Sequence, residues 1–519
     1  MNIIYDYIVI GSGFGGSVSA MRLTEKGYTV LVLEKGKRYR TEDFPKTNWN
    51  LRKYLWIPRF GLYGFQRLDL FKHAFILSGA GVGGGSLVYA NTLMKPPSEF
   101  FLHQQWSRFN DWQALLEPYY EMAHRMLGRV KLRKFYAEDE LLRDVAKEMG
   151  KEDSFDNVYV GVYYNENESA TDPYFGGTGP LRNPCKECAG CMVGCRENAK
   201  NTLDKNYLWF AEKNGAVILA ETLAWKITFT DGIYSVHTKS LHGKEATVFQ
   251  SKGIVVAGGV LGTLKLLLHQ KYIYKTMAGL SEKLGDSLRT NSETLSAVTN
   301  SSMKLNNGLA ISSIFKPAHD TFIEIVKYPD GSGVMKTLLS LATGGTHPPA
   351  LRPLRFLLNI LTHPHRWIRL LIMPGWASKT IIFLVMQSAD NAMRMTLKKG
   401  LFKKQLTIKN DGNKKVNAYI PLGQEVLNRY AEKIKAIPQN STAEILFNIP
   451  STAHILGGCP MGDSATEGVI NKKFQVFGYP GMYILDGSVI QGNLGVNPSF
   501  TITALSEYAM ALIPDKDRA

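Results

Sequence analysis

Three glycines near the start of the chain, Gly11, Gly13 and Gly16, have a spacing suited to phosphate chemistry, Gly-x-Gly-x-x-Gly. An apolar segment of strand length precedes them. A helix-like segment and a second apolar segment, ending at Glu34, follow them. In this order the first glycine permits a tight turn, the second lets the backbone approach a pyrophosphate, and the third lets the helix pack on the strand. The helix N-terminus offers N–H groups to phosphates, and Glu34 can accept hydrogen bonds from ribose. The stretch predicts a dinucleotide-binding β-α-β unit.

A second glycine-rich stretch covers residues 78–87 and contains Gly83, Gly84, Gly85 and Ser86. Backbone with so little side chain can lie directly against a flat or charged ligand. We therefore expect it to contact the ligand of the first glycines. A flexible loop is the alternative.

Four of the five cysteines are clustered as Cys185-x-x-Cys188-x-x-Cys191-x-x-x-Cys195. This spacing is typical of iron–sulfur ligation in bacterial ferredoxins, although Arg196 replaces the usual proline and only one such run occurs. Three interpretations stay open: an iron–sulfur cluster, a structural zinc held by four thiolates, and reduced cysteines that pack. Clustering of this kind argues against a disulfide framework.

The composition limits the classes of protein to consider. A chain of 519 residues with 45% hydrophobic residues exceeds one ordinary core, so two domains are expected. No run of about 18 uncharged apolar residues occurs, and no membrane-spanning helix is predicted. Because the first strand begins at about residue 4, no signal peptide is expected, and the expected location is the cytoplasm.

The middle of the chain changes pattern. Alternating apolar segments at residues 311–315, 322–326, 381–386 and 393–397 predict antiparallel strands. We therefore predict an α/β fold in which a Rossmann-type domain carries an inserted α+β domain with an antiparallel sheet. The predicted ranges are 1–300 for the first domain, which includes the cysteine segment 185–195, then 301–449 for the inserted domain and 450–519 for the return to the first domain.

Five motifs together resemble the glucose–methanol–choline (GMC) flavin oxidoreductases, and within them the cholesterol oxidase branch. The motifs lie at residues 81–88, 255–263, 454–462, 478–488 and 495–507, and the last three form a specific C-terminal pattern. The matches extend from residue 5 to about 510. The section from about 300 to 445 shows no match.

The resemblance implies FAD as the cofactor and assigns roles to single residues. It makes His454 the active-site histidine and Asn497 its partner beside the flavin. It implies FAD contacts for Gly11, Gly13, Phe14, Gly15, Gly16, Glu34, Gly83, Gly84, Gly85, Ser86, Asn91, Asp486 and Asn497. Where cholesterol oxidases carry an asparagine, this chain has Tyr89, and Asn91 is expected to take over that contact. No glutamate equivalent to the steroid-isomerising base is identified, so isomerase activity is not predicted.

The predicted reaction is FAD-dependent oxidation of a hydrophobic alcohol, sterol-like or long-chain, to the carbonyl, as part of lipid metabolism. Hydride would pass to flavin N5, and a histidine is suited to accept the hydroxyl proton. Two alternatives stay open. One is an iron–sulfur flavin dehydrogenase of a sugar or polyol that passes electrons to an acceptor other than oxygen, such as a protein or quinone. The other is a non-catalytic flavin-binding membrane adaptor.

The net charge of +16 is concentrated: residues 331–410 contain twelve Lys or Arg and one acid. Within residues 348–376, Arg352, Arg355, Arg366 and Arg369 alternate with large apolar residues. Short helices of this kind lie on an anionic bilayer, which would place the protein on the inner face of the membrane. A solvated basic face is the alternative. Nucleic-acid binding is not predicted because no recognition motif accompanies the charge.

Overall fold

The computed structural model describes residues 3–518, except 165–169, 242, 244–245, 301, 345–347, 401–403 and 412–414. Its α-helices are α1 (Phe14–Glu25), α2 (Leu51–Tyr54), α3 (Ser98–Phe101), α4 (Gln104–Ser107), α5 (Trp112–Met126), α6 (Ala137–Glu148), α7 (Tyr207–Lys213), α8 (Gly259–His269), α9 (Arg352–Thr362), α10 (Pro364–Ile372), α11 (Pro421–Lys433), α12 (Thr442–Phe447) and α13 (Ser499–Ala511). None of the described helices is both long and apolar enough to cross a membrane.

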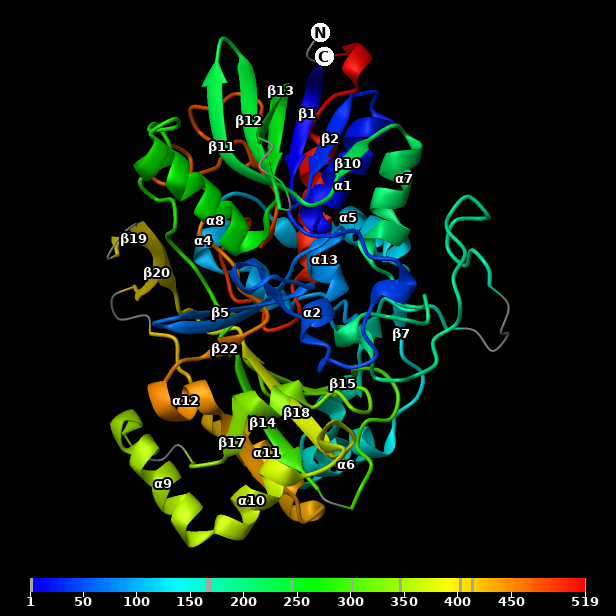
Figure 1. Ribbon diagram of the computed structural model, residues 1–519, viewed down its shortest axis with the longest axis vertical. Coiled ribbons are helices and arrows are strands. Elements are labelled where there is room, and N and C mark those ends of the chain that lie inside the picture. The colour runs from blue at the N-terminus through cyan, green and yellow to red at the C-terminus, as the bar shows by residue number, and fades with distance from the viewer. Residues whose placement is uncertain are drawn as a thin grey trace.

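The nucleotide-type sheet forms the upper half of the molecule in Figure 1. Its strands are β1 (Ile4–Ile10), β2 (Val30–Leu33), β10 (Val217–Leu219), β11 (Thr222–Thr230), β12 (Ile233–Ser240), β13 (Ala246–Val256) and β23 (Met482–Ile484). The order is β10-β2-β1-β13-β12-β11, and β23 also pairs with β13. The strands around β1 are parallel, while β11 and β12 are antiparallel. Apolar residues such as Val9 and Leu31 are fully buried, and α1 packs against β1, β2 and β13.

The antiparallel sheet forms the lower half, with α11 and α6 packed against it (Figure 1). Its strands are β8 (Phe155–Asn157), β14 (Thr294–Thr299), β15 (Ile311–Ala318), β16 (Thr321–Val326), β17 (Leu339–Leu341), β18 (Thr380–Gln387) and β21 (Ile437–Ser441). The order is β17-β21-β14-β18-β16-β15-β8. The α/β prediction with an antiparallel substrate sheet is therefore confirmed. Two strands, β8 and β14, come from the range expected for the first domain.

Smaller sheets connect and flank the two halves. They contain β3 (Trp56–Ile57) with β4 (Leu62–Tyr63), β5 (Gln66–Phe71) with β6 (Ala74–Gly79) and β22 (Ser451–Thr452), β7 (Val130–Lys131) with β9 (Tyr159–Val160), and β19 (Met393–Lys399) with β20 (Lys404–Asn410). The strand predicted at 393–397 therefore belongs to a separate two-stranded hairpin, β19–β20, and not to the substrate sheet.

The C-terminal segment closes the nucleotide half. Helix α13 packs against both α1 and α5, and Glu507 of α13 accepts two hydrogen bonds from Arg22 of α1, at 2.7 and 2.9 Å. The two chain ends lie side by side in Figure 1, and Lys516 Nζ is 2.7 Å from Oδ2 of Asp6 in β1. The first and last parts of the chain thus build one body.

Candidate active site

Two adjoining cavities lie at the carboxyl ends of the parallel strands. The smaller, about 120 Å³, runs along the turn between β1 and α1, and the larger, about 270 Å³, opens between the two sheets. Both are lined by Gly13, Gly79, Gly85, Ala257 and Gly259. Shared walls of this kind suit one elongated ligand that crosses from the nucleotide sheet towards the substrate sheet.

The glycines of the first turn divide into two groups. A Cβ on Gly15 would lie 1.7 Å from the Leu485 carbonyl oxygen, and one on Gly16 would lie 1.9 Å from the Gly11 oxygen. A Cβ on Gly13 would meet no protein atom within 4 Å. Gly13 lines both cavities and caps the N-terminus of α1, so its open side faces the ligand space and not the protein. The residues present therefore fit a dinucleotide whose pyrophosphate lies against this turn.

Glu34 follows β2, lines the smaller cavity and is buried. Its carboxylate also holds the surrounding loops together. It accepts hydrogen bonds from Ser12 Oγ at 2.8 Å and from the backbone N–H groups of Gly36 at 2.8 Å and Gly81 at 3.3 Å. The position is the one predicted for a carboxylate at the ribose.

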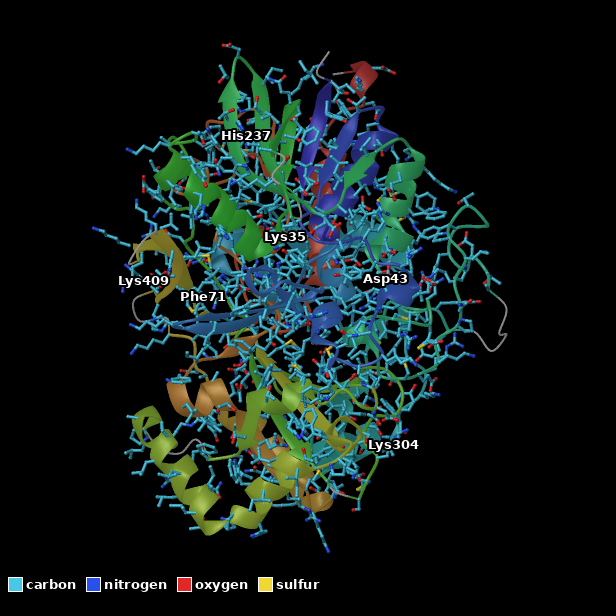
Figure 2. The ribbon with its side chains drawn as sticks, viewed as in Figure 1. Lys35, Asp43, Phe71, His237, Lys304 and Lys409 are labelled. Carbon is cyan, nitrogen blue, oxygen red and sulfur yellow. The ribbon has the colours of Figure 1, made fainter. Side chains whose placement is uncertain are left out.

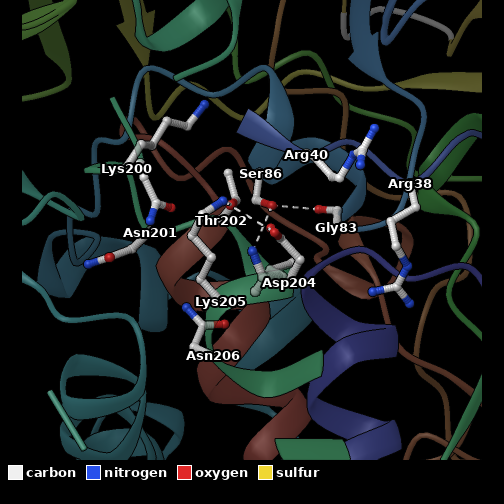
Figure 3. A network of polar contacts seen from close by, with 12 residues as sticks. Arg38, Arg40, Gly83, Ser86, Lys200, Asn201, Thr202, Asp204, Lys205 and Asn206 are labelled. Atoms are coloured by element: carbon white, nitrogen blue, oxygen red, sulfur yellow. Dashed lines mark hydrogen bonds and ion pairs between the residues drawn. The ribbon is translucent and has the colours of Figure 1, made fainter. Parts of the chain in front are cut away.

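The second glycine stretch packs directly on the first. A Cβ on Gly84, where φ is +53°, would lie 2.6 Å from the Cα of Gly13. Gly84 and Gly85 line the cavities. Gly83 and Ser86 do not line them. The Ser86 hydroxyl donates to the Gly83 carbonyl at 2.7 Å and accepts from the Leu203 N–H at 3.1 Å, so these two residues shape the loop (Figure 3).

His454 lies in the wall of the larger cavity, just after β22. Its Nδ1 is 2.9 Å from Oε2 of Glu293, a fully buried carboxylate. Glu293 is held in turn by the Thr452 hydroxyl at 3.1 Å and the Ala453 N–H at 3.0 Å. Burial alone would lower the pKa of His454, but the negative charge of Glu293 outweighs it and raises that pKa. The arrangement orients the imidazole and stabilises its protonated form.

Asn497 comes from the loop before α13 and lines the same cavity, which brings the two predicted catalytic side chains together. Its amide Nδ2 donates to Oε2 of Glu324 on β16 at 3.0 Å. Complete burial raises the pKa of Glu324 to about 7, and the hydrogen bond from Asn497 opposes only part of that effect. A second carboxyl group with a raised pKa therefore lies directly behind Asn497, although Glu324 itself does not line the cavity.

One wall of the larger cavity is mostly apolar and belongs to the substrate sheet and the segment before β17. It is formed by Leu295, Ile311, Val326, Tyr328, Met335, Ile382 and Leu384. Gly11 lines the smaller cavity, while Phe14, Gly15 and Asp486 line the larger one on the nucleotide side. His454 and Asn497 therefore share the larger cavity with this apolar surface.

Asn91 does not reach either cavity. The residue is fully buried with φ of +63°, and its amide Nδ2 lies 2.9 Å from Sγ of Cys191. Tyr89, Ala90 and Thr92 line the larger cavity instead. The prediction that Asn91 replaces the family's asparagine at the flavin is not supported, because its side chain points to the cysteine segment.

The four clustered cysteines, Cys185, Cys188, Cys191 and Cys195, border one small cavity of about 20 Å³. In the described part of the chain, no three His, Cys, Asp or Glu side chains are arranged to hold a metal ion. The prediction of an iron–sulfur or zinc site is therefore not supported. Burial raises the pKa of the Cys191 thiol to about 11, and that of Cys185 well above its usual range. Both shifts favour the protonated thiol in the metal-free protein.

Glu293 and Glu324 are candidate functional residues that the sequence reasoning missed, since they contact His454 and Asn497. Glu324 interrupts the apolar strand Thr321-Phe322-Ile323-Glu324-Ile325-Val326, and such an isolated charge in a buried strand was a usable signal. Glu293 precedes β14 and carries no comparable signal, because its role depends on a histidine 161 positions later in the chain.

Family models match three parts of the chain: a NAD(P)-binding Rossmann-like domain at residues 9–46, and GMC oxidoreductase at residues 181–270 and 361–506. A cholesterol oxidase from Mycobacterium tuberculosis is 44% identical over 99% of this chain and 91% of its own length. A cholesterol oxidase from Acinetobacter baumannii is 39% identical over 99% and 95%. A long-chain-alcohol oxidase of Arabidopsis thaliana is 24% identical over 98% of this chain and 67% of its own length.

Among solved structures, pyridoxine 4-oxidase from Mesorbium loti superimposes with a TM-score of 0.63 at 12% identity, covering 98% of this chain and 99% of that one. This likeness supports the fold. The sequence matches to the cholesterol oxidases extend over nearly the whole length of the chain, and they also establish its family. The chain therefore belongs to the GMC oxidoreductase family, in its cholesterol oxidase-like branch, and is an FAD-dependent alcohol oxidoreductase.

Proposed function

We propose that this enzyme oxidises the secondary hydroxyl of a flat, apolar, sterol-type molecule to a ketone. The observation that carries the proposal is the cavity in which His454 and Asn497 face an apolar wall from the substrate sheet. Sugars and polyols would leave most of their hydroxyls without partners on such a wall. The names of the similar proteins, cholesterol oxidase and long-chain-alcohol oxidase, favour hydrophobic alcohols in the same way. No finding favours a sugar dehydrogenase or a non-catalytic adaptor.

When bound, FAD supplies the acceptor for the hydride that leaves the carbon bearing the hydroxyl. Gly13, Glu34 and Gly85, together with the N-terminus of α1, would hold the cofactor. We assign His454 as the group that receives the hydroxyl proton, so that hydride and proton leave the alcohol separately and the carbonyl forms. Asn497 orients the oxygen, and Glu293 stabilises the protonated imidazole.

The test is anaerobic flavin reduction, followed by flavin absorbance, with a sterol, a long-chain primary alcohol and glucose as substrates. We expect reduction by the sterol at the highest rate and no reduction by glucose. His454→Ala should lower the rate by about two to four orders of magnitude while FAD stays bound. His237→Ala is the matched control, since His237 is on the outer β11–β12 hairpin, far from the cavity (Figure 2). Unchanged flavin reduction in His454→Ala would contradict the assignment.

Glu324 favours a second activity at the same site, migration of a carbon–carbon double bond in the ketone product. Such a step moves a proton between two carbons and needs a base that titrates near neutral pH, as this carboxyl group does. A sterol with an isolated double bond beside the ketone would give a conjugated enone that absorbs in the ultraviolet. We expect Glu324→Gln to retain flavin reduction and to release the unconjugated ketone. Equal yields of enone from both proteins would exclude this role.

We further propose that α9 and α10, here called the helical hairpin, contact the membrane from which the substrate is extracted. The exposed apolar side chains of this hairpin are Leu354, Leu357, Leu358, Leu361, Ile368, Leu371 and Ile372. Arg355, Arg366 and Arg369 accompany them, which is the composition of an interfacial helix on an anionic surface. A peripheral location on the inner face of the membrane is proposed with it.

Arg352 does not belong to this lipid-facing set, although the sequence placed it there. Its guanidinium pairs with the Glu444 carboxylate, and both side chains are 2% exposed. Glu444 also accepts a hydrogen bond from the Thr294 hydroxyl at 3.2 Å, at the start of β14. Met335 of the cavity wall is next to Lys336, whose Nζ donates to the Leu371 carbonyl at 2.8 Å. The hairpin thus contacts, at two points, residues that adjoin the cavity wall in the chain: Thr294 through Glu444, and Lys336.

Vesicle sedimentation tests the membrane contact. Replacing Leu357 and Leu361 by Ser should reduce binding to neutral phosphatidylcholine vesicles, because these side chains are 52% and 66% exposed and contribute little to the core. Leu223→Ser, at an exposed site on β11, is the matched control. Equal binding of all three proteins would contradict the proposal.

A further inference from the structure

A basic groove lies between the β5–β6 turn, the β19–β20 hairpin and the segment that follows α12. Two hollows of about 520 and 510 Å³ share Lys72 and His73 as a common wall. The other charged residues that line them are Lys398, Lys399, Lys409 and Lys415. We call this feature the basic groove. It belongs neither to the cofactor cavities nor to the helical hairpin.

The charge in the basic groove is not compensated by neighbouring acids. Within the described part of the chain, no ion pair joins its five lysines to a carboxylate, and all five are exposed. Asp411 is the one acid between residues 391 and 420, and it does not line the groove. Burial together with the charge of Lys72 lowers the pKa of His73, in agreement with a positive local field. A set of ammonium groups that converge without acidic partners suits an anionic ligand.

The groove is continuous with the proposed membrane-contacting surface. Phe447, the last residue of α12, lines the groove and is 65% exposed, and α12 packs against α9. Leu70, beside the β5–β6 turn, is 63% exposed. In Figure 1 the β19–β20 hairpin, the end of β5, α12 and α9 follow one another down one side of the molecule, and Figure 2 labels Phe71 and Lys409 on that side.

We propose that the basic groove binds the phosphate headgroup of an anionic phospholipid while the helical hairpin enters the apolar layer. The inference rests on the membrane contact proposed above and adds the lipid that the protein selects. Clusters of four to eight basic residues next to an interfacial helix recognise anionic lipids. The exposed apolar rim at Leu70 and Phe447 favours a lipid over a soluble polyanion, because a headgroup brings acyl chains that can cover these two residues.

Sedimentation with two kinds of vesicle tests the proposal, one of phosphatidylcholine alone and one that also contains phosphatidylglycerol. The groove variant replaces Lys72, Lys398 and Lys409 by Gln. The charge-matched control replaces Lys147, Lys472 and Lys473 by Gln; all three are exposed and lie outside the groove. We expect the groove variant to lose about fivefold in affinity for the anionic vesicles per lysine, or about a hundredfold in total. Its binding to neutral vesicles and its turnover of a detergent-solubilised sterol should not change.

The outcomes separate the groove from the hairpin. If the groove variant and the control lose the same affinity for anionic vesicles, overall charge explains the binding and the headgroup site is refuted. Undiminished preference of the groove variant for anionic vesicles also refutes it. The Leu357→Ser, Leu361→Ser variant should lose binding to both kinds of vesicle. Failure of that variant to do so would contradict the hairpin contact, whereas the headgroup site would still be decided by the groove variant and its control.

Discussion

Replacing Glu293 by Gln tests the central contact of the active site. The change keeps the size of the side chain and its capacity to accept hydrogen bonds from Thr452 and Ala453, but it removes the negative charge 2.9 Å from His454. Two unit charges 4 Å apart interact by about 4 kcal/mol at an effective dielectric constant near 20. Because His454 becomes positive as it takes the hydroxyl proton, most of this stabilisation is present only in the transition state. A loss of about 3–4 kcal/mol corresponds to a 10²–10³-fold lower rate of flavin reduction.

The pH dependence of the same variant gives an independent readout. Glu293 raises the pKa of His454 against the effect of burial, and only the neutral imidazole can accept a proton. In the wild-type enzyme, kcat/KM should therefore fall as the pH drops below that raised pKa. Without the carboxylate, burial dominates and the pKa falls, so the acidic limb of the profile should move to lower pH. The deficit of the variant should be largest in alkaline buffer and smaller in acid.

Stopped-flow reduction of the flavin under anaerobic conditions, measured across the pH range, is the assay. Glu425→Gln is the control, because Glu425 is an exposed residue of α11 whose partner is Arg429. An acidic limb that stays in place, or that moves to higher pH, would refute the reasoning even if the rate falls. A slower rate alone would be consistent with a general disturbance of the site.

Further outcomes follow from other contacts. Glu324→Gln should remove a pH-dependent destabilisation of about 3 kcal/mol. The pKa of this carboxyl is about 7 in the fold and near 4.5 when unfolded, so the destabilisation develops as the pH rises from 4.5 to 7 and is absent in more acidic solution. Denaturant midpoints of both proteins at acidic and alkaline pH would show it, and parallel curves would contradict it. Gly13→Ala should fold normally but bind FAD more weakly, whereas Gly15→Ala should lower the melting temperature of the apoprotein, since its Cβ would overlap a carbonyl oxygen. Equal melting temperatures of the Gly13→Ala and Gly15→Ala apoproteins would contradict this difference between the two glycines. Elemental analysis should find no stoichiometric iron or zinc, and Cys191→Ser should keep the flavin spectrum; iron that disappears in this variant would restore the cluster interpretation.

Local patterns were sufficient to predict much of this fold. The turn at Gly11–Gly16 and the strands at 311–315, 322–326 and 381–386 are encoded by neighbouring residues, so periodicity and glycine spacing identify them. The segment 393–397 has the same alternation, yet it pairs with β20 outside the substrate sheet. Alternation predicts that one face of a strand is buried, but it does not identify the strand with which that segment pairs.

The side chains that escaped prediction are those whose chemistry depends on distant partners. Arg352 looked like a membrane-facing arginine because its neighbours are apolar and basic, but Glu444, 92 positions later, makes it a buried ion pair. Asn91 was expected at the flavin, and its left-handed backbone turns the amide towards Cys191. The cysteine spacing of a ferredoxin predicts ligation only if the backbone folds the thiols around one point, which spacing alone cannot ensure.

The composition of the cofactor cavity determines when FAD can bind during synthesis of the chain. Its walls combine Gly13 and Phe14 with Asp486 and Asn497, and α13 completes the packing of α1. A ribosome-bound chain that has exposed only its first few hundred residues therefore has the phosphate turn but not the opposite wall. FAD binding should begin only after the C-terminal segment has been synthesised. A truncation that removes α13 should yield a colourless, protease-sensitive protein, even though the glycine turn at its N-terminus is still present.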